Sequence, residues 1–187
     1  MKNLHAVVAS LLLLSGIALA QAAKPVETRT VSQVLDSSVT NVEGEFVPAA
    51  DAMPEDKYSF APTNGEFKGV RSFEQQVKHV AAVNYVMAAA ILGEKPPVDT
   101  GKESGPDSVK SKADIMKYLK DSFVYLHKAT ESINERNLVA PVHDPFGEGN
   151  ATRLALASGA VGHCFDHYGQ MVEYLRMNGI IPPASRR

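Results

Sequence analysis

The sequence predicts an all-α protein, a four-helix bundle that follows a cleavable signal peptide. Four long segments carry apolar residues at helical spacing, and loops rich in proline and glycine separate them. No segment alternates apolar and polar residues convincingly enough for a strand. The loops are of moderate and unequal length, which favours an up-and-down bundle with at least one longer crossover.

The N-terminus has the features of a secretory signal peptide. Lys2 supplies a basic start, residues 6–14 form a short apolar run, and an Ala-x-Ala sequence ends at Ala20. We therefore expect cleavage after Ala20, export to the periplasm or beyond the cell, and no stable membrane insertion afterwards. An uncleaved anchor is the alternative, but the run is too short to span a bilayer comfortably, and no cysteine follows it for lipid attachment. Residues 21–30 are expected to be a flexible segment.

The composition of the mature chain limits the classes of partner. Removing 20 of the 187 residues leaves 167, enough for one domain with a full hydrophobic core. Lys2 is the only charged residue removed, so 18 basic residues remain against 21 acidic ones, a net charge of −3. With this charge and no basic patch, nucleic-acid binding is not expected. Cys164 is the only cysteine, which excludes an internal disulfide and favours a buried thiol.

The first two helices are predicted from apolar periodicity and from their end signals. The first covers about residues 31–53, and Pro48 inside it should kink or divide it. The second covers about residues 72–92, where Ser72 can cap the N-terminus. Gly93, followed by two prolines, stops it.

The third and fourth helices follow a long connection. Residues 94–107 contain three prolines and two glycines, so this loop is expected to be exposed and mobile. The third helix covers about residues 112–136, with Ser111 as a weak capping signal. The fourth covers about residues 151–177. The bundle is therefore expected over residues 31–183, with 184–187 as a tail.

Two histidines of the fourth helix could hold a metal ion. His163 and His167 are one turn apart, and side chains at this spacing lie about 40° apart around a helix axis. His79, in the second helix, is the third candidate ligand. All three project to the edge of an apolar arc, so a shared site would be open to a cleft. Three neutral imidazoles leave a coordination position vacant, as in catalytic sites, and they suit zinc or nickel best, with iron and copper as further choices.

From the residues alone, a metal site and three unrelated histidines both remain open, because a helical His-x-x-x-His pair is often a simple surface or core pair. Two other histidines are weaker candidates. His127 has Glu131 one turn later and is expected to form a solvated pair with it. His143 lies beside Asp144 in a loop predicted over residues 141–147 and could approach a cleft.

Several segments resemble the DinB-like family of proteins, and together they cover about residues 31–183. The longest is RSFEQQVKHVAAVNY at residues 71–85, which looks like the second helix of that family. The others match its first helix and the exit from it, its fourth helix, and its C-terminal end: EGEFVP at 43–48, MPEDKY at 53–58, DHYGQ at 166–170, YLR at 174–176 and GIIPP at 179–183. Each motif is short, but all occur in the expected order and spacing.

The resemblance implies a bundle of up-down-down-up connectivity that is often dimeric. It also implies a divalent metal held by one histidine of the second helix and two of the fourth. These positions correspond to His79, His163 and His167. Asn84 and Asp166 fit as groups that orient an imidazole N–H, with a simple surface role as the alternative.

The resemblance leaves two classes of function open. Some relatives are thiol-dependent transferases or isomerases, and others are suspected hydrolases, so the first hypothesis is an exported metal-dependent hydrolase or transferase of a small molecule. Reduced thiols are scarce outside the cytoplasm, which weakens the transferase reading. Candidates for a general base are Asp144, Asp166 and Glu173. The second hypothesis is a non-catalytic metal-binding or stress-related interaction protein.

Overall fold

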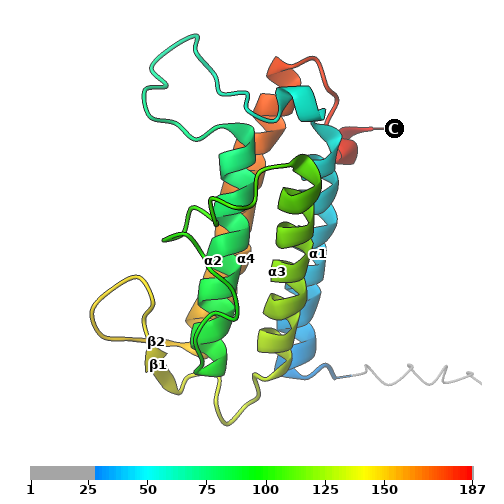
Figure 1. Cartoon of the computed structure of the whole chain (residues 1–187). Coiled ribbons are helices and arrows are strands. Elements are labelled where there is room, and N and C mark those ends of the chain that lie inside the picture. The colour runs from blue at the N-terminus through cyan, green and yellow to red at the C-terminus, as the bar shows by residue number, and fades with distance from the viewer. Residues whose placement is uncertain (1–27, 187) are drawn as a thin grey trace, which may run out of the picture.

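The computed structural model describes residues 28–186. The expected signal peptide, residues 1–20, and residues 21–27 of the expected flexible segment lie outside this range. Within it the chain forms four α-helices, as predicted (Figure 1): α1 (Val31–Ala52), α2 (Phe73–Leu92), α3 (Lys112–Glu131) and α4 (Arg153–Met177). Short 3-10 turns follow α1 and α4, namely η1 (Glu55–Lys57) and η2 (Pro183–Ser185).

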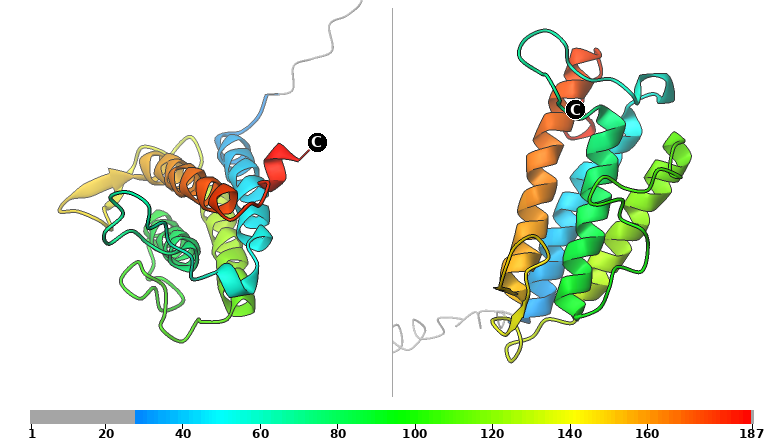
Figure 2. Two further views of the ribbon diagram at one scale, coloured as in Figure 1. Left: turned by 90° about the horizontal axis from the view of Figure 1, so that it is seen from above. Right: turned by 60° about the vertical axis from the view of Figure 1, so that its left-hand side comes forward.

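The helices have the up-down-down-up connectivity that the resemblance implies. In Figure 1, α1 and α4 run in one direction and α2 and α3 in the other. Seen from above in Figure 2, α2 lies between α3 and α4. Since α2 and α3 are parallel, residues 93–111 must return along the bundle, a distance of about 30 Å for a 20-residue helix. We call residues 93–111 the crossover.

Local signals fix the ends of the helices. Thr30 and Ser72 form capping boxes at the starts of α1 and α2. Ser111 and Thr152 accept backbone N–H groups at the starts of α3 and α4. Gly93 ends α2 with a left-handed φ of 75°. The caps predicted at Ser72 and Ser111 and the stop at Gly93 are therefore confirmed.

The hydrophobic core runs along the axis of the bundle, and α2 is buried on most of its sides. Burial of each large apolar side chain stabilises the fold by about 1.5–3 kcal/mol. Cys164 lies in this core, as predicted. The largest fully buried apolar side chains are Phe46, Met53, Phe73, Ile91, Ile115, Leu119, Phe123, Leu126, Ile133, Met171 and Leu175.

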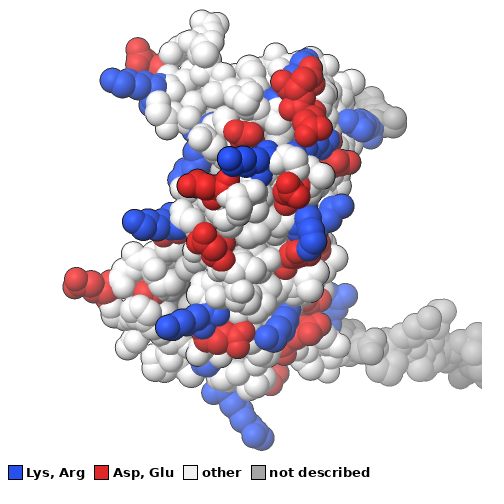
Figure 3. Space-filling view, in the orientation of Figure 1, with Lys and Arg blue, Asp and Glu red and all other residues white. Residues whose placement is uncertain are grey.

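Charges of both signs are interspersed on the face shown in Figure 3, so neither sign gathers into a large patch there. No helix among residues 28–186 combines the length and the apolar character needed to cross a bilayer.

Two predicted helix features differ from the structure. The third helix ends at Glu131 and not near Arg136. Beyond it, the side chain of Asn134 accepts from the Arg136 N–H, and that of Asn137 bonds to the backbone of Ser132 and Asn134; such bonds compete with helical hydrogen bonds. Pro48 does not divide α1, which is continuous. Pro48 lies on an exposed face, where water can satisfy the carbonyl that its missing N–H leaves free.

The prediction that no strand is present was wrong. Within the described residues, β1 (Pro141–His143) pairs antiparallel with β2 (Asn150–Thr152), so the loop expected over 141–147 begins as a strand and α4 starts two residues later than expected. Gly149 supports the turn between the strands with a φ of 115°. Strands of three residues are too short to show the alternation that identifies a strand in a sequence.

Most of the crossover is exposed, as predicted, but its middle packs against the bundle. Gly105 and Pro106 are buried against α2, where Lys78 donates a 2.8 Å hydrogen bond to the Pro106 carbonyl. Tyr118 of α3 donates to the Asp99 carbonyl at 3.1 Å. The middle of the crossover is thus attached to two helices.

His127 does not pair with Glu131 as predicted but joins α3 to α1. Its Nδ1 lies 2.5 Å from a carboxylate oxygen of Asp36, and its Nε2 lies 3.0 Å from one of Glu43. Burial alone lowers the pKa of this imidazole, but the hydrogen bonds to Asp36 and Glu43 outweigh it, so the pKa is raised. The protonated ring donates one N–H to each carboxylate.

This cluster predicts a pH-dependent contribution to stability. Because the folded-state pKa of His127 is raised, its contribution is complete below the unfolded value of about 6.5 and is lost as pH rises through the folded-state pKa. Replacing His127 by Gln should lower the free energy of unfolding by about 1 kcal/mol at pH 5.5 and by less at pH 9, measured by urea denaturation.

Asp36→Asn provides the control, because without that carboxylate the destabilisation caused by His127→Gln should depend less on pH. A destabilisation that grows as pH rises would contradict the assignment.

Candidate metal centre

The structure brings His79, His163 and His167 together between α2 and α4. Their ring centroids are 4.5–5.0 Å apart, and the rings meet edge to face. One ring nitrogen from each histidine lies within 4.8 Å of the other two. We call these residues the histidine cluster. The convergence of two helices that the sequence predicted is therefore present in the structure.

The cluster is more enclosed than predicted. His79 and His167 are each only 6% exposed, and His163 is half-buried. The one-turn spacing on α4 aligns two rings, and the packing of α4 beside α2 brings up the third.

A backbone carbonyl of the crossover orients His79. The Nδ1 of His79 lies 2.6 Å from the carbonyl oxygen of Glu103. A carbonyl oxygen only accepts, so Nδ1 carries the proton and donates it. The lone pair of His79 is then on Nε2, which faces His163.

The backbone that presents this carbonyl is strained. Gly101, Lys102 and Glu103 have φ values of 55°, 52° and 70°, so three consecutive residues are left-handed. Such a conformation costs a non-glycine residue on the order of 1–3 kcal/mol. Position 101 also favours glycine for a steric reason, because a Cβ there would lie 2.1 Å from the carbonyl oxygen of Gly105. The turn is closed by a 2.9 Å hydrogen bond from the Gly105 N–H to the Thr100 carbonyl.

A chain of side-chain hydrogen bonds orients His167. Its Nδ1 lies 2.5 Å from Oε1 of Gln76. The amide of Gln76 donates to Gln170 at 2.8 Å, and the amide of Gln170 donates to Asp166 at 3.2 Å. The NH2 group of Gln76 faces Gln170, so its Oε1 faces the ring of His167. An amide oxygen can only accept a hydrogen bond. His167 therefore also carries its proton on Nδ1 and leaves Nε2 free.

His163 completes the cluster with a different environment. Its Nε2 lies 3.1 Å from Nε2 of His79. Two nitrogens bound to one zinc at 2.0–2.1 Å with a tetrahedral angle would be about 3.3 Å apart, so the spacing suits a shared ion. The Nδ1 of His163 is buried, and within residues 28–186 it has no hydrogen-bond partner. Outside the cluster only packing therefore holds this ring, while its Nε2 is within hydrogen-bond distance of His79.

The surroundings keep all three rings neutral. Burial, followed by the neighbouring histidines, lowers the pKa of His163 to about 3. Burial and the proximity of His79 lower the pKa of His167 to about 4, and burial also lowers the pKa of His79. The guanidinium of Arg71 contributes to all three shifts. Neutral imidazoles keep a lone pair free for a metal ion.

Other residues predicted near the site lie elsewhere or act indirectly. Asn84 hydrogen-bonds to Ser122 and to the thiol of Cys164 and not to an imidazole, so its predicted role was wrong. Asp144 and Glu173 make contacts outside the cluster, with the Phe146 N–H and with Arg176. His143 lies in the hairpin. Within the described residues no carboxylate hydrogen-bonds directly to the cluster, and Asp166 reaches His167 only through two glutamines.

Sequence reasoning missed three groups around the cluster. Gln76 and Gln170 stand three residues from His79 and His167, so helical spacing was a usable signal for both. The role of Glu103 could not be inferred from its residue type, because it acts through its backbone carbonyl. Only Gly101 and Gly105 marked an unusual backbone there.

A four-helix bundle with histidines from its second and fourth helices defines a class of protein, and the comparisons place the chain within it. The family model of the DinB superfamily matches residues 39–171. The chain therefore belongs to the DinB superfamily, as its resemblance to the family implied.

Solved structures share the fold at low sequence identity. A DinB-like protein from Bacillus cereus is 16% identical with a TM-score of 0.61, covering 81% of this chain and 95% of its own. A DinB-like protein from Bacillus subtilis is 19% identical with a TM-score of 0.62, covering 82% and 99%. A conserved protein from Enterococcus faecalis is 18% identical with a TM-score of 0.63, covering 80% and 98%. The search of curated proteins found no match.

The strained turn of the crossover gives a test of its geometry. Replacing Gly101 by Ala should lower the free energy of unfolding by about 1–3 kcal/mol, since the new Cβ collides with the Gly105 carbonyl in a left-handed turn. Urea denaturation monitored by circular dichroism measures the change.

Gly44→Ala is the matched control, because a Cβ at this helical position meets nothing within 4 Å. It should be neutral or stabilise by up to about 1 kcal/mol. Equal effects of the two substitutions would show that the turn does not require glycine.

Proposed function

We propose that the protein binds one divalent metal ion through His79, His163 and His167. The observation that carries the proposal is the arrangement of three neutral imidazoles, one nitrogen from each within 4.8 Å of the others. Two of the rings donate their remaining N–H outward, to Glu103 and Gln76, as histidine ligands of metals commonly do. The donor set fits the ion that the family implies.

Zinc and nickel suit this donor set best. All three ligands are neutral nitrogen donors, which zinc, nickel, copper and iron accept more readily than magnesium or calcium. Three protein ligands leave a position for a further ligand, as in catalytic zinc sites and unlike closed structural ones.

We infer a metal-dependent hydrolase or thiol-dependent transferase acting on a small molecule, with the hydrolase favoured by the proposed export. A bound ion would supply Lewis-acid chemistry, because it polarises a carbonyl or lowers the pKa of a water or thiol. Arg71 contributes positive potential at the cluster, which favours an anionic substrate or a thiolate. The histidines position the reacting group, and the substrate or solvent must take part in proton transfer.

One observation favours a non-catalytic alternative. No carboxylate among residues 28–186 hydrogen-bonds directly to the histidine cluster, so a general base is lacking at this distance. An ion held by α2 and α4 would then brace the two helices against each other. Such a brace should raise the melting temperature without any turnover.

The metal proposal predicts one zinc or nickel ion per chain. Elemental analysis of the purified mature protein should give about one equivalent, and His163→Ala should lower the affinity for zinc at least about 100-fold by removing a direct ligand. His143→Ala, in the exposed hairpin, is the control and should retain full metal content. Full occupancy in His163→Ala would contradict the proposal.

Chelation distinguishes the hypothesis of a metal-dependent enzyme from that of a metal ion that only braces the helices. Treatment with a chelator should lower the melting temperature in both, while ester, amide or thiol-transfer turnover that disappears with the metal supports only the enzyme. Turnover that survives both chelation and His163→Ala would exclude the histidine cluster as its source.

We further propose that the chain is exported and cleaved after Ala20, from the basic and apolar N-terminal sequence. Mass spectrometry of the protein from fractionated cells should find a mature N-terminus at Gln21 outside the cytoplasm. Replacing Leu12 by Arg, in the centre of the apolar run, should retain the uncleaved chain in the cytoplasm. An intact N-terminus in the wild-type protein would contradict cleavage.

A further inference from the structure

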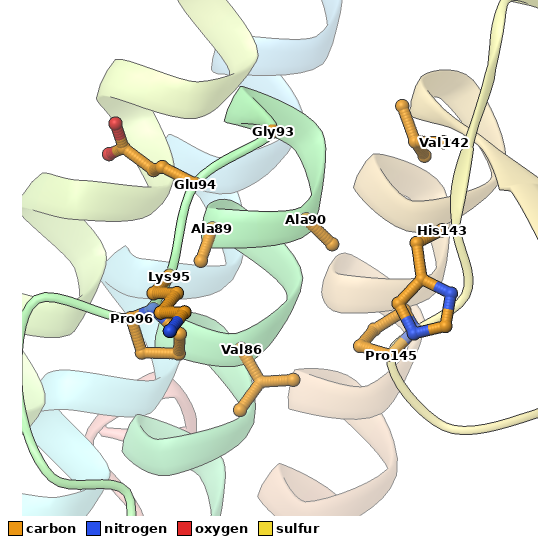
Figure 4. A pocket seen from close by; sticks show the side chains of 10 residues that line it. All are labelled: Val86, Ala89, Ala90, Gly93, Glu94, Lys95, Pro96, Val142, His143 and Pro145. Atoms are coloured by element: carbon orange, nitrogen blue, oxygen red, sulfur yellow. The ribbon is translucent and has the colours of Figure 1, made fainter.

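A second candidate site lies between α2 and the β1–β2 hairpin. It is a cavity of about 610 Å³ next to the C-terminal half of α2. Figure 4 shows its floor on α2, with the start of the crossover on one side and the hairpin on the other. Small-molecule pockets commonly have volumes between about 300 and 1,000 Å³. The cavity is thus of a size that holds one such molecule.

The lining of this cavity is apolar and stiff. Val86, Ala89 and Ala90 form the floor. Two prolines stand on opposite sides, Pro96 in the crossover and Pro145 in the hairpin, and each has a fixed φ. Such walls lose little conformational entropy when a ligand binds.

The polar groups at the cavity favour an anion. Lys95 and His143 line it from opposite sides of α2. Glu94 also lines it, but its carboxylate accepts from Tyr125 at 2.5 Å and lies 3.4 Å from Lys128. No ion pair engages Lys95 within residues 28–186, so its ammonium is the unpaired charge at this cavity.

The cavity is close to the histidine cluster but separate from it. None of the three histidines lines it. Val86 follows His79 by seven residues, which places the two about 10 Å apart along the same face of α2. A ligand of the cavity therefore needs no metal for its binding.

We propose that this cavity binds a small apolar carboxylate, with the hydrocarbon over Val86 and Ala90 and the carboxylate paired with Lys95. His143 lines the opposite side, against the hydrocarbon. The apolar floor selects a hydrocarbon, and the free ammonium selects an anion over a neutral molecule of the same length. This site is independent of the proposed metal function.

Octanoate is the probe, and isothermal titration calorimetry on the full mature chain measures its affinity. Lys95→Gln should weaken octanoate binding about three- to tenfold by removing the charge. Ala90→Trp should weaken it more than tenfold by filling the floor, and Ala90→Leu should have an intermediate effect. Octanamide should bind the wild-type protein about as weakly as octanoate binds Lys95→Gln.

Matched controls separate the cavity from general effects. Lys102→Gln removes a charge elsewhere in the crossover, and Ala113→Trp adds a ring on the exposed first turn of α3, so both should bind octanoate normally. His163→Ala should also bind normally, which separates this site from the metal proposal. Absence of octanoate binding, equal affinity for octanamide, or normal binding by folded Ala90→Leu would overturn the inference.

Discussion

Two hydrogen bonds donated by imidazole Nδ1–H groups determine what the centre of this bundle can do. The Glu103 carbonyl accepts from His79, and the Gln76 amide oxygen accepts from His167. Each fixes the tautomer that leaves Nε2 free, and both free nitrogens then belong to the same cluster as His163. Without these acceptors the rings could protonate the nitrogens that face one another. These two acceptors therefore leave the cluster with free nitrogens that can bind one cation together.

The bundle topology supplies one of these acceptors. Because α2 and α3 run in parallel, the crossover must travel back along α2, and it passes His79 on the way. Lys78 and Tyr118 attach it to α2 and α3, and this attachment holds a left-handed turn that a free loop would avoid. The other acceptor, Gln76, comes from the buried side of α2 itself. The contacts that hold the crossover and α2 in the bundle thus also orient the histidines.

Sequence periodicity was sufficient for the helices but not for all of the site. Long apolar patterns and caps such as Ser72 identified the four helices, and the resemblance gave their connectivity. His79, His163 and His167 were found from helical spacing and the family motifs. The Glu103 carbonyl could not be predicted, since a backbone group has no residue signature. Nor could the partners of His127, because they come from α1 and depend on how the helices pack. The hairpin was too short to show a period.

The tautomers of the histidine cluster are the most direct test of this account. Long-range proton–nitrogen correlation spectra of the metal-free protein, with histidine labelled by nitrogen-15, report which nitrogen of each ring carries the proton. Near pH 7 we expect His79 and His167 to be neutral and protonated on Nδ1. Protonation of either ring on Nε2 would contradict the account, because that nitrogen could not then offer a lone pair to a shared ion.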